Sequence, residues 1–331
     1  MITSTDKRPL LSVVLSFRNE EDVLEELAAR LETAFLSLPA EYELIFVNDA
    51  STDSSLDILV HRAKQNNGVK IINMSRRFGV SECVIAGMHY AKGDAVIYMD
   101  ADLQDPPELI PELFEQWQQG ADVVHTRRTA REGEPAFKLL LTDVAYRLIG
   151  AFQDFDLSPS VGDFKLLSRR AVNELLNLKE KTPYLRGLVA WVGFKQVIVP
   201  YVRQPRAGGV THFPIFQRLF RDLVNLRGPA GMLIIGVTSF TLLPIMIFLL
   251  LGGLIFFGCV VALVVWIAFM VSRTNVPAWT GLLIGFLMLS GVQLVGLGTL
   301  GIYLCRIYQD VRGRPMYIVE SAIGFDGANT V

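Results

Sequence analysis

The chain reads Asp100-Ala101-Asp102-Leu103-Gln104-Asp105 directly after the apolar run Ala95–Met99, which has the length and composition of a short buried strand. Because alternate residues of an extended chain point to the same side, we expect Asp100 and Asp102 to lie together just past that strand. Two neighbouring carboxylates repel each other unless a cation lies between them, and oxygen ligands suit Mg²⁺ or Mn²⁺. A solvated acidic turn before the helix that Pro106 begins is the alternative interpretation.

Apolar runs with the length of strands alternate with helical patterns through the first part of the chain. This alternation predicts an α/β fold with a parallel sheet covered by helices on both faces. The expected strands are Leu10–Ser16, Tyr42–Val47, Val69–Met74, Ala95–Met99, Asp122–His125, Asp163–Ser168 and Lys195–Val202. We expect four helices between these strands. The first starts near Val23, the second ends near Gln65, the third starts near Val80 and the fourth covers Pro106–Trp117.

Polar side chains follow four of these strands in succession. Ligands of such sheets bind at the carboxyl ends of the strands, so this repetition favours a binding crevice over solvated loops. The first strand is not followed by G-x-G-x-x-G, and no Walker-type loop is present, so a nucleotide would be held by side chains and a metal. The polar groups are Ser16, Asn19 and Glu20; Asn48 and Asp49; Ser75 and Arg76; and Asp100 with Asp102.

Length and composition limit the classes of protein that the chain can represent. With 331 residues we expect about two domains, and a net charge of -2 gives no indication of nucleic-acid binding. The three cysteines have no zinc-like or disulfide-like spacing. Residues 1–9 are polar and lack an apolar core, so we expect no cleavable signal peptide.

The last third of the chain is dominated by two long apolar runs without charged residues. They are Thr241–Val271 and Thr280–Cys305. Runs of this length predict two membrane-spanning helices, and the basic residues on both flanks place the large domain and the tail in the cytoplasm. We therefore expect a multi-pass protein of the inner (plasma) membrane, with the lipid bilayer as a partner. The expected parts are a catalytic domain (1–212), a juxtamembrane amphipathic helix (213–230), two transmembrane helices (231–308) and a cytoplasmic tail (309–331). A buried helical hairpin in a soluble protein is the alternative.

Several motifs together resemble the family-2 glycosyltransferases of the GT-A type, and in particular the polyprenyl-phosphate glycosyltransferases with two C-terminal membrane helices. The resemblance implies a GT-A fold, which is a Rossmann-like α/β domain with a mainly parallel sheet. The motifs occur in the family's order along nearly the whole chain. They are Ser12–Glu21, Phe46–Asp53, Ser75–Gly79, Asp100–Glu108, Gly162–Leu166 and Arg186–Gly193.

Roles for individual residues follow from this resemblance. Asp100 and Asp102 would hold Mg²⁺ or Mn²⁺ on the donor diphosphate, with Gln104 beside them, and Asp102 would take part in catalysis with Asp163. Asp49 would contact the base of the nucleotide. The other donor-binding candidates are Ser16, Asn19, Glu20 and Arg76.

The acceptor phosphate is expected to meet a group of basic residues and one hydroxyl, because guanidinium groups suit phosphate oxygens. The chain departs from the family here: Gly209-Val210-Thr211-His212-Phe213 has His212 where a lysine is usual, which replaces a fixed charge by a titratable one. The acceptor candidates are Arg131, Arg186, Arg203, Arg206, Thr211 and His212.

The implied reaction is the inverting transfer of a sugar, with UDP-glucose as the expected donor, to polyprenyl phosphate such as undecaprenyl phosphate. A phosphate monoester is largely dianionic at neutral pH, since its second pKa lies near 6. Asp163 is therefore either a base or an orienting group. The alternatives are a membrane-anchored nucleotide-sugar-binding scaffold without turnover, and a transferase with another lipid acceptor. The sequence is also compatible with a homo-oligomer.

Overall fold

A computed structural model of the chain describes residues 8–129, 161–178, 180, 183–202, 243–271 and 277–325. The described residues fall into two compact units. One unit contains a β-sheet with its helices and includes the residues from Pro315 onward; the other contains two long helices.

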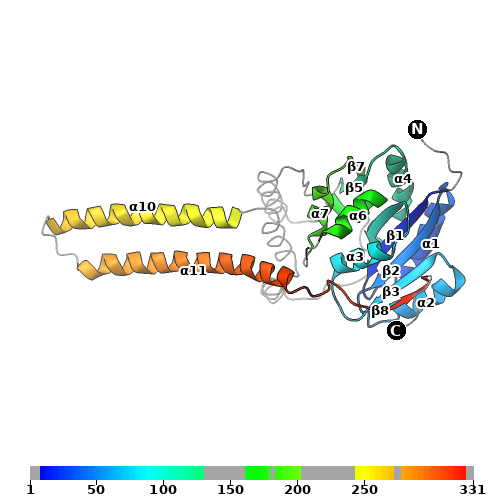
Figure 1. Cartoon of the computed structure of the whole chain (residues 1–331), viewed down its shortest axis with the longest axis horizontal. Helices are drawn as coiled ribbons and strands as arrows, with labels where there is room; N and C mark the ends of the chain where they lie inside the picture. Colours follow the sequence, from blue (N-terminus) through cyan, green and yellow to red (C-terminus); the bar gives the residue numbers. More distant parts are fainter. Residues whose placement is uncertain are drawn as a thin grey trace. The chain divides into compact units, whose positions relative to one another are not determined.

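The first unit is built on an eight-stranded sheet of order β7-β5-β6-β4-β1-β2-β3-β8 (Figure 1). Strands β1 to β4 are parallel, β6 is antiparallel to both of its neighbours, and β8 is antiparallel to β3. This confirms the predicted α/β fold with a mainly parallel sheet. The strands are β1 (Leu10–Phe17), β2 (Glu41–Asn48), β3 (Val69–Met74), β4 (Ala95–Asp100), β5 (Val123–Arg128), β6 (Val161–Ser168), β7 (Gln196–Tyr201) and β8 (Val319–Ile323).

Helices cover both faces of this sheet because the strands carry apolar side chains on both faces. The main core packs α1, α2 and α4 on one face, through side chains such as Leu27, Leu59 and Leu113. Helices α3 and α6 contact the strands and each other. The helices are α1 (Leu24–Leu36), α2 (Ser55–Gln65), α3 (Val80–Tyr90), η1 (Pro107–Leu109), α4 (Ile110–Gln118), α6 (Arg169–Asn177) and α7 (Leu185–Trp191).

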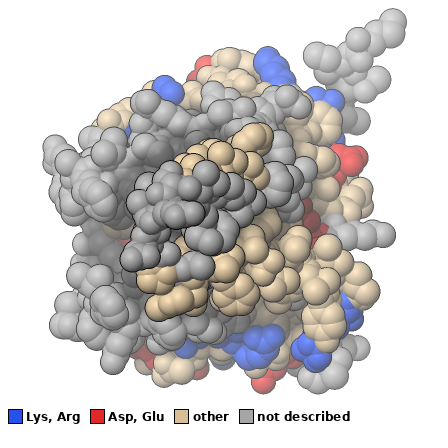
Figure 2. Space-filling view, turned by 90° about the vertical axis from the view of Figure 1, so that its left-hand side faces the viewer, with Lys and Arg blue, Asp and Glu red and all other residues tan. Residues whose placement is uncertain are grey.

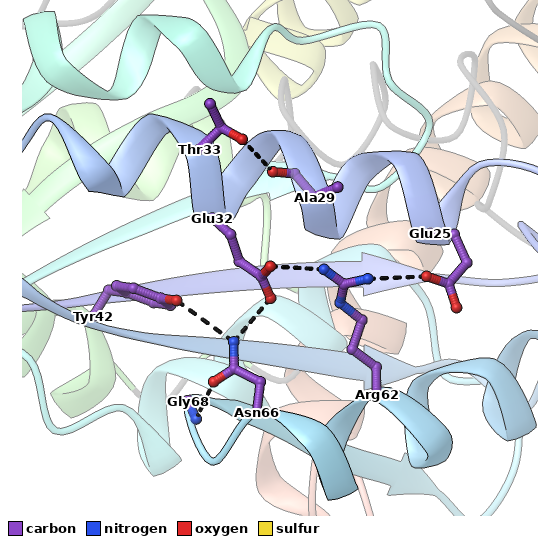
Figure 3. A network of polar contacts seen from close by, with 8 residues as sticks. All are labelled: Glu25, Ala29, Glu32, Thr33, Tyr42, Arg62, Asn66 and Gly68. Atoms are coloured by element: carbon purple, nitrogen blue, oxygen red, sulfur yellow. Dashed lines mark hydrogen bonds and ion pairs between the residues drawn. The ribbon is translucent and has the colours of Figure 1, made fainter.

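A network of polar contacts joins α1 to α2 (Figure 3). The Arg62 guanidinium donates from Nη1 to Glu25 Oε2 at 3.0 Å and from Nη2 to Glu32 Oε2 at 2.7 Å. Asn66 Nδ2 donates to Glu32 Oε1 at 2.8 Å, while Asn66 Oδ1 accepts from the Gly68 N–H at 2.8 Å. The two helices, and hence the turns that precede them, are thereby fixed relative to each other.

In its described part, the second unit consists of two helices that pack against each other, α10 (Leu243–Val271) and α11 (Ala278–Val311). No Lys, Arg, Asp or Glu occurs in residues 243–271 or 277–305, so the described side chains of these ranges carry neither blue nor red in Figure 2. Many described apolar side chains of these helices are exposed, including Leu254 at 70% and Leu282 at 70%.

The expected location of the protein requires a correction. Across the described parts of the chain, none of the helices combines the length and the apolar character that crossing a membrane demands. The prediction of a multi-pass protein of the plasma membrane is therefore wrong. It relied on the length of two runs without charged residues. The expected amphipathic helix at 213–230 lies outside the described residues.

The C-terminal residues form part of the sheet. Strand β8 pairs with β3 in the register Ile72↔Ala322 and Asn73↔Ser321. Beside it, the Ser75 N–H donates to the Ile318 carbonyl at 3.0 Å. The segment predicted only as a tail therefore adds an edge strand to the sheet of the first unit.

Candidate active site

The carboxyl ends of four parallel strands meet at one edge of the sheet. The register pairs Ser16 of β1 with Asp100 of β4, and Asn48 of β2 with Asn73 of β3. Asn48 Nδ2 donates to Asn73 Oδ1 at 2.8 Å, and Asn48 Oδ1 accepts from the Ser51 N–H at 2.9 Å. The structure thus brings the polar ends of β1 to β4 into one row.

The turns after β1 and β2 are tied together by Asn19. Its Oδ1 accepts from the Thr52 N–H at 2.8 Å, its Nδ2 donates to Thr52 Oγ1 at 3.2 Å, and its N–H donates to Ser51 Oγ at 3.1 Å. The Glu20 N–H donates to Ser55 Oγ at 2.9 Å. Asn19 therefore lies in the strand-end row, where its side chain joins two turns.

Asp49 fixes the turn that follows β3. Its buried carboxylate accepts, at Oδ1, the N–H of Phe78 at 2.6 Å and the N–H of Gly79 at 3.3 Å. Gly79 has φ 131°, a conformation that favours glycine. The exposed Arg76 lies over the Phe78 ring, 4.0 Å from its centroid. Asp49 and Arg76 thus both contact the turn that follows β3, at the same edge of the sheet.

The carboxylates after β4 lie close to others that the fold brings in. Burial, together with the charges of Asp163, Asp102 and Asp105, raises the pKa of Asp100 to about 7, and the charge of Arg186 opposes this shift. Asp102 Oδ1 accepts the Gln104 N–H at 3.1 Å. Asp105 is fully buried and accepts a hydrogen bond from the Tyr201 hydroxyl. The Asp100 carboxyl therefore lies in a region of surplus negative charge.

Asp163 is bound by a guanidinium group from another element. The β4–β6 register pairs Tyr98 with Lys165, and continuing it by two residues brings Asp163 beside Asp100. Arg186 of α7 donates from Nε to Asp163 Oδ1 at 2.6 Å and from Nη2 to Oδ2. Burial alone would raise the pKa of Asp163, but the hydrogen bonds and charge of Arg186 outweigh it and hold that pKa below its ordinary value.

The donor set fits a divalent cation that also binds a substrate. The groups at the end of β4 are carboxylates, and the raised pKa of Asp100 reflects its burial and the neighbouring negative charge, which a dication would offset. Among the described residues, no three His, Cys, Asp or Glu side chains are arranged to hold a metal. A cation held by two carboxylates and substrate phosphates meets both observations, because Mg²⁺ commonly binds in that way.

Comparison with known proteins decides the family. The model of glycosyl transferase family 2 matches residues 12–176. An uncharacterized glycosyltransferase of Synechocystis sp. is 38% identical over 321 residues, which cover 96% of this chain and 96% of that protein. The chain belongs to glycosyl transferase family 2. This confirms the resemblance that the motifs carry, and the protein is a glycosyltransferase.

Other family-2 proteins match the chain over most of its length. The SfII prophage-derived bactoprenol glucosyl transferase of Shigella flexneri is 33% identical over 94% of this chain and 98% of its own. Among solved structures, mannosyl-3-phosphoglycerate synthase from Rubrobacter xylanophilus is 20% identical, with a TM-score of 0.47 over 70% of this chain and 73% of that chain.

Only one of the six acceptor candidates lies within the described residues. Arg186 lies at the site, where it binds Asp163. The other five candidates lie outside the described residues; they are Arg131, Arg203, Arg206, Thr211 and His212.

Two features of this family-2 site were not predicted from the sequence. One is the contact between Tyr201 at the end of β7 and Asp105, which no local pattern indicates. The other is Lys165, which is fully buried between the apolar residues Phe164 and Leu166. A lone charged residue inside an apolar strand is a signal that could have directed attention to it.

Proposed function

We propose that this glycosyltransferase moves a glucosyl residue from a nucleotide diphosphate sugar, UDP-glucose, to the phosphate of a polyprenol such as undecaprenyl phosphate, with inversion at the anomeric carbon. The observation that carries the proposal is the meeting of Asp100 and Asp163 with Arg186 at the end of β4. This arrangement places carboxylates that suit a cation beside a guanidinium group, which suits phosphate oxygens. The names of relatives such as the Shigella flexneri bactoprenol glucosyl transferase support the acceptor class.

The donor would lie along the ends of β1 to β4. The turns after β1 and β2 are cross-linked by Asn19, and Asp49 anchors the turn after β3, so this edge is rigid before a ligand arrives. Asp49 and Arg76 would then meet the nucleotide, and Asp100 with Asp102 its diphosphate. A preorganised site of this kind loses little conformational freedom on binding.

A divalent cation held by Asp100 and Asp102 would offset the charge that builds on the nucleoside diphosphate as it leaves. In the transfer, an oxygen of the acceptor phosphate forms a bond to the anomeric carbon while the bond from that carbon to the nucleoside diphosphate breaks. Attack from the face opposite the leaving group inverts the carbon's configuration.

The role that we propose for Asp163 is to orient Arg186. Both carboxylate oxygens of Asp163 accept hydrogen bonds from Arg186, so they are engaged in holding a guanidinium group. The acceptor phosphate is largely dianionic at neutral pH and needs no base to become a nucleophile. Arg186, held by Asp163, would bind the acceptor phosphate and bring it toward the sugar.

The proposal is tested by incubating the purified protein with a panel of labelled nucleotide sugars and undecaprenyl phosphate, with and without EDTA. We expect label to move into lipid from UDP-glucose only without EDTA. Asp100→Asn should reduce transfer by about a hundredfold, whereas Asp94→Asn, a change at an exposed carboxylate outside the strand-end row, should leave it unchanged. Donor binding without transfer to any polyprenyl phosphate would refute the proposal and indicate a binding scaffold.

A further inference from the structure

Three buried polar atoms gather beneath the candidate active site. Within the described parts of the chain, hydrogen-bond partners are lacking for the Tyr98 hydroxyl, Lys165 Nζ and His125 Nδ1. The strand register pairs Lys165 with Tyr98 on one side and with His125 on the other. Directly paired residues of neighbouring strands point to the same face, so the three side chains form one row across β4, β6 and β5.

This row lies one step behind the reacting groups. Asp163 is two residues before Lys165 on β6, and Asp100 is two residues after Tyr98 on β4. Because side chains alternate along a strand, each pair shares a face of the sheet. Asp163 is thus close to two cations from different elements: Lys165, which is on the same strand, and Arg186, which donates to it from α7.

The charge on Lys165 is expensive to keep in this place. Burial lowers the pKa of Lys165 to about 7; the Arg186 charge also lowers it, and the Asp163 charge opposes both. A Met or Leu would fill the same space at no electrostatic cost, since apolar replacements of buried charges are often neutral or stabilising. A lysine here therefore needs an explanation other than packing.

We propose that Lys165 is a positioning residue for Asp163: its ammonium holds the Asp163 carboxylate in line with Arg186 beside Asp100. Without that charge, Asp163 faces the other carboxylates with only the charges of Arg186 and Arg128 to compensate among the described side chains. The carboxylate and the guanidinium group then lose alignment. The inference rests on the proposed transfer reaction for its kinetic consequence, and on geometry alone for the interaction between Lys165 and Asp163.

The groups that face Lys165 come from every neighbouring element. They are Tyr98 on β4, His125 on β5, Asp163 on β6 and Arg186 on α7. Burial lowers the pKa of His125 to about 4, and burial raises that of Tyr98 well above its ordinary value, so neither changes charge near pH 7. Loss of the Lys165 proton would therefore lower transfer as the pH rises through 7.

The kinetic test compares Lys165→Met, which keeps the volume, with Lys165→Arg, which keeps the charge at every pH. Rates are measured from pH 6 to 9 at saturating cation and donor, so that cation binding does not limit them. We expect Lys165→Met to be about tenfold slower at pH 6.5 and to lose the decline above pH 7, and Lys165→Arg to keep its rate there. Lys70→Met removes a lysine paired with Glu43 elsewhere in the sheet and should change neither rate nor profile.

A second measurement needs no turnover. Lysine ¹³Cε labelling should show, by nuclear magnetic resonance, one signal that titrates near pH 7 and disappears in Lys165→Met. In Asp163→Asn that titration should move to lower pH, because the carboxylate that favours the ammonium is gone. If it does not move, or if folded Lys165→Met keeps the wild-type rate and profile, the inference is wrong. A wild type that shows the coupled titration but transfers no sugar refutes the proposed reaction instead.

Discussion

Removing the ion pair between Asp163 and Arg186 should affect stability and transfer to very different extents. Two unit charges about 4 Å apart attract by about 4 kcal/mol at an effective dielectric constant near 20. The Arg186 and Asp163 side chains are 33% and 26% exposed, so solvent screening reduces this figure. We expect Arg186→Met to lower the free energy of unfolding by about 2 kcal/mol.

Transfer should fall much further, because Arg186 is the residue that we propose to bind the acceptor phosphate. A misplaced group of this kind costs about a hundredfold in rate. The assay is a double-mutant cycle of Asp163→Asn, Arg186→Met and the double variant, followed by chemical denaturation and by initial rates of lipid glycosylation. If Asp163 acts through Arg186, the double variant should be no slower than Arg186→Met alone.

Two results would refute this reasoning. Additive losses of rate in the double variant would show that Asp163 acts on the substrates directly, as a base would. A free energy of unfolding that does not depend on pH in acid would contradict the ion pair. The pKa of Asp163 is lowered in the fold, so its stabilising contribution is present above the unfolded value near 3.9 and is lost as the pH falls through the folded value.

Three further changes test other parts of the structure. Asp100→Asn and Asp102→Asn should each reduce cation-dependent transfer by about a hundredfold, with Asp94→Asn as the unaffected control, in initial rates with and without Mg²⁺. Burial lowers the pKa of His125 to about 4 from 6.5, so the unfolded chain binds more protons between these values. The wild type should lose free energy of unfolding as the pH falls through that range, and His125→Gln should lose less, in denaturation at pH 4.5 and 7. Glu320→Ala removes the hydrogen bond that Glu320 of β8 accepts from Asn73 of β3, and it should weaken UDP binding several-fold by calorimetry. Unchanged affinity would show that β8 does not support the site.

The sheet was largely predictable because its strands are apolar runs. The seven expected strands correspond to β1–β7 with differences of no more than three residues at either end. Strand β8 was not predictable by that route. Its five residues, Val319–Ile323, include Glu320 and Ser321, and they follow two long helices in the sequence. A short edge strand of mixed polarity that pairs with a strand some 250 positions earlier leaves no local pattern.

The site was predictable to the extent that local sequence brings its groups together. Asp100 and Asp102 were placed at a strand end from the pattern alone, and the structure has β4 end at Asp100. The pairing of Asp163 with Arg186 depends on β6 entering antiparallel between β4 and β5. Strand order and direction are set by long-range packing, so that contact could not be read from spacing.

Backbone conformation is the third kind of information that composition hides. Asn19, Ala50 and Leu103 have φ values of 56°, 55° and 57°, and they follow β1, β2 and β4. Asn accepts this left-handed conformation readily, but in Ala and Leu it costs about 1 kcal/mol or more. Such strain persists only where neighbouring contacts over-determine the backbone, as the hydrogen bonds of Asn19 to the next turn do here. The strained turns coincide with the strand ends that carry the donor candidates. The fold therefore keeps this edge rigid at a cost in local backbone energy, and a rigid edge favours binding of a charged nucleotide sugar.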